Sequence, residues 1–148
     1  MHKIITQIGL LATTGSVALL STSCGVTKVV QCNSIATVTK EAEVVANDFA
    51  KSAQTTGPDK VSKLLTDTSS KMNKYSKEVQ ALPIQDEKIK GFQSRIATSY
   101  LDYEKALTGM SSAVTAKNKA GVEKAVADLE GLASKEKTLI SEFDAYCK

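Results

Sequence analysis

The sequence predicts an all-α protein, an up-down-up-down four-helix bundle preceded by an N-terminal signal segment. Three observations support this fold class. Apolar residues recur at steps of three and four along four stretches, which is the period of an amphipathic helix. Hydrophobic residues make up 42% of the 148 residues but aromatic residues only 5%, which favours helices over sheets. The connections between the stretches are short, so consecutive helices should be antiparallel neighbours.

Proline bounds the first two predicted helices. The first is expected from about Lys28 to Thr55 and ends before Gly57-Pro58, since proline cannot continue the hydrogen-bond ladder. Asp59 is the expected N-cap of the second helix, which ends at Leu82, the residue before Pro83. The expected apolar faces are Ile35, Val38, Ala42, Val45 and Phe49 in the first helix, and Val61, Leu65, Thr68, Met72, Tyr75, Val79 and Leu82 in the second.

The third and fourth helices begin at residues that favour N-caps. Asp86 is expected to open the third helix and Asn118 the fourth. Tyr103 lies in the apolar register of the third helix, whereas Tyr100 lies off it and is expected to be half-buried with its hydroxyl in water. The expected apolar faces are Ile89, Phe92, Ile96, Tyr103, Leu107, Met110 and Val114 in the third helix, and Val122, Ala125, Val126, Leu129, Leu132, Leu139, Phe143 and Tyr146 in the fourth.

The start of the chain has the pattern of an export signal. A basic start at Lys3 is followed by an uncharged stretch from Ile4 to Leu20 and by small residues ahead of Cys24. An uncleaved membrane anchor is the alternative, because the uncharged stretch is about as long as the shortest membrane spans. We favour cleavage, and the predicted organisation is a signal peptide at 1–23, an anchor linker at 24–27 and a bundle domain at 28–148.

Three cysteines, Cys24, Cys32 and Cys147, constrain the topology. Export implies an oxidising compartment in which thiols pair, and an odd number leaves one over. In the predicted bundle the first helix begins at the end where the fourth helix finishes, so Cys32 and Cys147 lie at the same end. We therefore predict a disulfide between them; the alternative is that both are small buried hydrophobic residues.

The segment Leu20-Ser21-Thr22-Ser23-Cys24 resembles the lipobox of bacterial lipoproteins. In that family the cysteine is diacylated, typically with palmitate, and becomes the mature N-terminus. The resemblance implies lipidation of Cys24 and a location at a bacterial membrane, facing the periplasm or an equivalent extracytoplasmic compartment. The lipobox leucine three residues before the cysteine is Ser21 here. Ser21 and Ser23 also suit an ordinary signal peptidase, so both cleavage modes stay open.

Four short segments resemble uncharacterised helical lipoproteins of photosynthetic bacteria. They are Gln31-Cys32, the turn from Ala81 to Asp86, the stretch from Tyr100 to Tyr103, and Tyr146-Cys147. The resemblance implies placement in the cell envelope or the thylakoid lumen. It carries no catalytic residue to this chain.

The composition argues against an enzyme. The single histidine, His2, lies in the predicted signal peptide, so the mature chain lacks the commonest general base and metal ligand. We expect no catalytic residue, no metal and no cofactor. The net charge of +3 and the single arginine, Arg95, also argue against a nucleic-acid partner.

Two charged features have both a functional and a structural interpretation. Glu136 interrupts the apolar face of the fourth helix, and a buried acid there would mark a functional site. We favour a place at the bundle edge, where its carboxylate either reaches solvent or pairs with Lys135 or Lys137. A second feature is a lysine strip on the second helix, which is either a docking strip for anionic lipid or an acidic protein, or, as we favour, a solvated face. The strip consists of Lys71, Lys74 and Lys77.

Together these features predict a non-enzymatic, lipid-anchored envelope protein that binds or scaffolds another envelope component. The membrane is its first expected partner, through the N-terminal lipid, and an envelope protein is the second. The alternative function is a carrier of a small apolar ligand held between the helices. Such a ligand is expected near Met72, Tyr75, Tyr103 and Met110.

Overall fold

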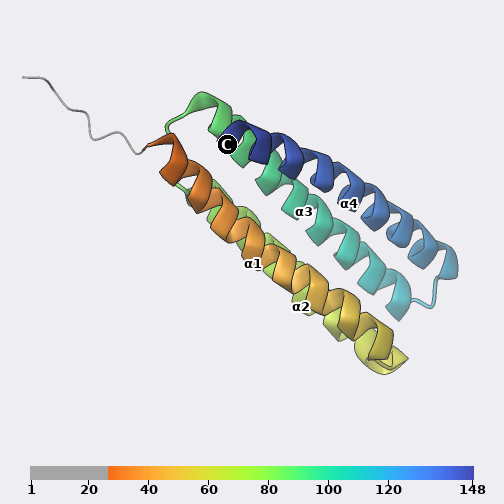
Figure 1. Cartoon of the computed structure of the whole chain (residues 1–148). Helices are drawn as coiled ribbons and strands as arrows, with labels where there is room; N and C mark the ends of the chain where they lie inside the picture. Colours follow the sequence, from red (N-terminus) through yellow and green to blue (C-terminus); the bar gives the residue numbers. More distant parts are fainter. Residues whose placement is uncertain (1–26) are drawn as a thin grey trace, which may run out of the picture.

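The computed structural model describes residues 27–148, which form four helices joined by short turns (Figure 1). The start of α1, the α2–α3 connection and the end of α4 lie at one end of the molecule. Within the described residues the all-α four-helix prediction is confirmed, while the predicted signal peptide and Cys24 lie outside them. The helices are α1 (Lys28–Thr55), α2 (Pro58–Ala81), α3 (Glu87–Thr115) and α4 (Lys119–Cys147).

Local capping chemistry explains where these helices begin. Asp86 accepts hydrogen bonds from the backbone N–H groups of Lys88 and Ile89, each at 2.9 Å, and Asn118 caps α4 in the same manner. The prediction that Asp59 caps α2 is wrong. Gly57 is the N-cap and Pro58 occupies the first helical position, where the missing N–H of proline costs nothing.

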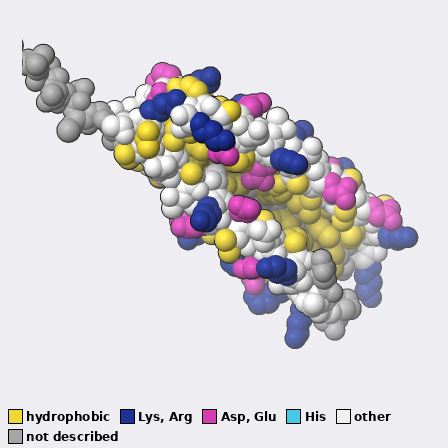
Figure 2. Space-filling model, viewed as in Figure 1, with side chains coloured by type: hydrophobic (Ala, Val, Ile, Leu, Met, Phe, Trp, Pro, Cys, Tyr) yellow, Lys and Arg dark blue, Asp and Glu magenta, His cyan; other side chains and the backbone are white. Residues whose placement is uncertain are grey.

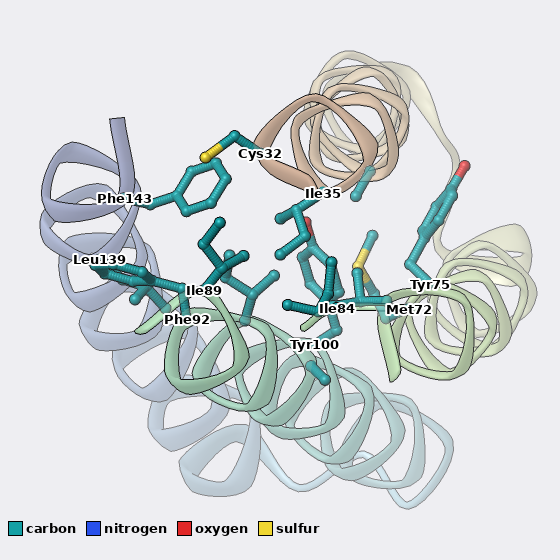
Figure 3. Close-up of a cluster of buried hydrophobic side chains, with 14 of the residues drawn as sticks. Cys32, Ile35, Met72, Tyr75, Ile84, Ile89, Phe92, Tyr100, Leu139 and Phe143 are labelled. Carbon is teal, nitrogen blue, oxygen red and sulfur yellow. The ribbon is translucent and has the colours of Figure 1, made fainter. Parts of the chain in front are cut away.

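All four helices contribute to one hydrophobic core (Figure 3). The ring of Phe92 on α3 meets that of Phe143 on α4 edge-on, with centroids 5.6 Å apart. Helix α3 is central, because it packs most extensively on α2 and then on α4. Helix α1 packs mainly on α2 and makes only a small contact with α4.

This asymmetry corrects two expectations about burial. Tyr100 is only 1% exposed, not half-buried, because the central α3 is covered on more than one side and buries a wider face than one register stripe. Tyr103, expected in the core, is half-buried. Val126 of α4 is 39% exposed although it lies on the predicted apolar face, since α1 leaves most of α4 uncovered.

The predicted disulfide is present between Cys32 and Cys147. Their Cα atoms are 5.9 Å apart, although 115 residues separate them in sequence. The bridge joins the first turns of α1 to the last turn of α4, as the antiparallel topology requires. None of the helices within residues 27–148 combines the length and the apolar character that crossing a membrane requires.

Candidate functional site: a groove between α1 and α4

A groove of about 740 Å³ separates α1 from α4, lined by residues from Ala36 to Phe49 on α1 and from Leu129 to Asp144 on α4. The hydrophobic surface of this hollow is visible between the two helices in Figure 2. Met72 of α2 and Tyr100 and Leu107 of α3 form its floor. The groove exists because α1 and α4 are joined at the disulfide end but do not pack on each other beyond it.

Small residues widen the groove between its walls. Ala36, Ala42 and Ala46 line it from α1, and Ala133 lines it from α4. Phe49 of α1 adds a large apolar side chain toward the end far from the bridge. From Ala36 to Phe49 the wall is about 20 Å long at the helical rise. The groove is therefore an elongated apolar channel about four helical turns long.

Acidic side chains enter this apolar surface from both walls. Glu136 comes from α4 and Glu43 from α1, and Tyr103 of α3 lies between the two helices. Lys40 and Lys137 line the same two walls. Burial raises the pKa of Glu136 above its usual range and the charge of Glu43 raises it further, while a hydrogen bond from the Tyr103 hydroxyl acts in the opposite direction. Burial and the neighbouring Glu136 raise the pKa of Tyr103, so this hydroxyl stays protonated and able to donate.

Of the two arrangements expected for Glu136, the ion pair with Lys135 or Lys137 is absent among the described residues, and the side chain is half-buried. Its carboxylate has the Tyr103 hydroxyl as a neighbour, which acts to lower the pKa that burial raises. Glu136 points into a cleft that the bundle leaves open, so it is partly desolvated without being at a fully solvated edge. Such a groove can bind a partner or ligand that has an apolar surface and that also offers a hydrogen-bond donor or a positive charge to the partly desolvated acid.

The residues expected around a ligand divide into two sets. Met72 and Tyr103 line the groove, whereas Tyr75 and Met110 do not line it and pack in the core. The lysine strip is exposed on α2 and does not line the groove. Within it, Lys74 forms an ion pair with Glu78 at 3.3 Å.

Sequence reasoning missed Glu43. It lies beside the apolar stripe of α1 rather than on it, so the periodicity gives it no weight. The available signal was a second stripe that contains Ala36, Glu43 and Ala46 at steps of seven and three, which is also a helical face. This second face predicts a groove wall only if α4 is already known to be separated from α1.

Comparison with protein-family models, with curated proteins and with solved structures finds no match to this chain.

Proposed function

We propose that this protein is an exported, lipid-anchored and non-enzymatic module that binds another envelope component in the groove between α1 and α4. The groove itself carries the proposal: a long apolar channel, with acidic and basic side chains on both walls, is open where α1 and α4 of a regular bundle would pack together. The signal-like N-terminus and the lipobox resemblance at Cys24 support the anchored location. The Cys32–Cys147 bridge is consistent with an oxidising compartment.

An amphipathic helix of a partner protein is the occupant that the groove fits best. A channel about 20 Å long accepts about four helical turns. The alanines on both walls allow a partner backbone to come close, and Glu43 and Glu136 supply acceptors for lysine or arginine on the partner helix. Binding of such a helix would bury the apolar groove surface that α1 and α4 leave exposed to solvent.

Site-specific photo-crosslinking in cells tests this proposal. A photoreactive residue at Ala46 faces the groove, and one at Val44 is the matched control, because Val44 lies on the same helix with 55% exposure outside the groove. We expect one defined envelope protein to be captured from position 46 only, and Ala133→Trp to block its binding to the purified chain. The proposal would be refuted by equal crosslinking from positions 46 and 44, or by partner binding that Ala133→Trp leaves unchanged.

A small apolar ligand is the second candidate, favoured by the size of the groove. Its volume of about 740 Å³ falls within the range of small-molecule pockets. Native mass spectrometry of membrane-extracted protein separates the candidates, since a carrier retains an added ligand mass that Ala133→Trp removes, whereas a scaffold retains none. The same measurement reports leader removal, acylation of Cys24 and the two-hydrogen loss of the bridge.

The lysine strip is a proposed secondary contact for an acidic partner or anionic lipid. All three lysines are exposed on α2. Changing them together to glutamine should weaken partner capture and membrane partitioning. If both are unchanged, the strip is a solvated face.

A further inference from the structure

The end of the bundle that carries the disulfide also exposes apolar side chains. Among the described residues, Val29 and Val30 are 60% and 53% exposed, and they are adjacent in the first turn of α1. Side chains on a helix lean toward its N-terminus, so both valines project toward this end of the molecule. Transfer of these two neighbouring side chains from water to an apolar environment would be favourable in free energy.

Two lysines at the same end contact one aromatic ring. The Nζ atom of Lys28, from α1, lies 4.0 Å from the ring centroid of Tyr146, and that of Lys88, from α3, lies 4.5 Å from it. Of the nearby acids, Glu87 pairs with Lys90 at 2.6 Å. Asp86 accepts hydrogen bonds from backbone N–H groups and from the Tyr146 hydroxyl, and the charge of Lys28 is among the causes that lower its pKa. The end therefore presents two ammonium groups on one aromatic ring, and neither forms an ion pair within residues 27–148.

This end is held in place by contacts among three helices. The Cys32–Cys147 bridge joins α1 to α4, and the Tyr146 hydroxyl donates to Asp86 at 3.1 Å. The side-chain oxygen of Gln31 accepts hydrogen bonds from the backbone N–H groups of Gln85 and Asp86. The valines and lysines consequently project from a preformed surface, which lowers the entropic cost of binding.

We propose that the disulfide-bearing end of the bundle binds directly to a bilayer containing anionic lipid, with Val29 and Val30 among the headgroups and Lys28 and Lys88 against the phosphates. Paired apolar and basic side chains are typical of interfacial membrane binding. Figure 2 shows hydrophobic and basic side chains at this end of the molecule, with acidic side chains among them. The contact uses residues of the described fold and does not depend on acylation of Cys24, so it goes beyond the proposed tether.

An acidic protein fits this surface less well than a lipid. A stable protein interface buries about 800 Å² on each partner, far more than two valines provide. Lysine is also depleted from protein interfaces, whereas an anionic bilayer accepts flexible ammonium groups at any position. The small area and the lysines together favour a lipid surface.

A tryptophan reporter tests the proposal in the full chain, which contains no tryptophan. Val30→Trp places an indole at the proposed contact, and Val44→Trp is the matched control, since Val44 is 55% exposed on the same helix about 21 Å away. Vesicles of phosphatidylcholine alone are compared with an equal mixture that contains phosphatidylglycerol. We expect blue-shifted emission and quenching by brominated acyl chains only for Val30→Trp and only with phosphatidylglycerol.

A charge variant supplies the quantitative readout. Lys28→Gln with Lys88→Gln in the Val30→Trp chain should lower the ratio of inserted to solvent-exposed indole by about fivefold per lysine, or about 25-fold together. Circular dichroism shows that each variant remains helical, and Cys24→Ser shows that the effect survives without acylation. Equal quenching at positions 30 and 44, insertion into phosphatidylcholine alone, or no effect of the lysines overturns the proposal. An emission shift seen only with an acidic protein overturns it in favour of a protein partner.

Discussion

Reduction of the Cys32–Cys147 bridge should remove a large part of the stability of this bundle. The bridge joins residues 115 positions apart, almost the entire described fold. In the chain-entropy model such a loop lowers the entropy of the unfolded chain by about 16 cal/mol/K, which stabilises the fold by about 4.8 kcal/mol at 25 °C. Domains of this size are stable by only about 5–15 kcal/mol, so the loss is comparable with the total.

The same change should have a local effect on α1. This helix packs mainly on α2 and barely contacts α4, so the bridge supplies much of its attachment to α4. After reduction, the amides of α1 should exchange with solvent faster than those of α3, which is covered by two neighbours. The bridge therefore has a global and a local consequence that separate measurements can resolve.

Urea unfolding of the oxidised and reduced chain measures the global effect. Cys24→Ser is introduced first so that no third thiol can exchange with the bridge. With an m-value of about 1–3 kcal/mol/M, the midpoint should fall by between about 2 and 5 M on reduction. A Cys32→Ala/Cys147→Ala variant is the control, because reductant should leave its midpoint unchanged. A fall of less than about 0.5 M would refute the loop-closure reasoning, and equal exchange in α1 and α3 would refute the local one.

Three further predictions concern single side chains. Gln31→Ala removes the acceptor for the backbone N–H groups of Gln85 and Asp86 and should lower the free energy of unfolding by about 2 kcal/mol in urea titrations, whereas an unchanged midpoint would show that water replaces it. Lys117 has a φ of 52°, so Lys117→Gly should raise that free energy by about 1 kcal/mol, and a lower Tm would contradict this. Because the pKa of Glu136 is raised in the fold, its contribution to stability is greatest in acid and falls as pH rises from the ordinary glutamate pKa through the raised one. Glu136→Gln should thus be more stable than the parent at neutral pH but not in acid. A difference in Tm between the two proteins that does not change with pH would contradict a raised pKa of Glu136 in the fold.

The helix boundaries could be predicted because the signals that determine them are local. Asp86 and Asn118 accept hydrogen bonds from the N–H groups of the turn that follows them, wherever the helix later packs. Pro83 likewise forces Leu82 into extended backbone whatever surrounds it. Asp59 was a wrong N-cap because two local signals compete there, and Pro58 at the first helical position prevails.

Burial was harder to predict because periodicity reports which face of a helix is apolar, and not how many neighbours cover it. Tyr100 lies off the register stripe of α3, yet it is buried because α3 is the central helix. Val126 lies on the stripe of α4 and remains exposed because α1 does not reach it. The disulfide was predicted correctly, unlike the burial of these two residues, because that prediction depended only on antiparallel topology and the positions of two cysteines.

The groove itself was beyond sequence reasoning because its width depends on pairs of side chains from distant segments. If α1 closed onto α4, Glu43 would approach Glu136 as both lost water, and two carboxylates in an apolar environment repel each other strongly. The bridge holds the two helices together at one end, and closing them farther along would desolvate both acids. A helix or ligand that brings a positive charge removes this repulsion and fills the apolar walls at the same time. The two acids that make closure of the empty groove unfavourable are therefore the groups that an occupant of the proposed chemistry would contact.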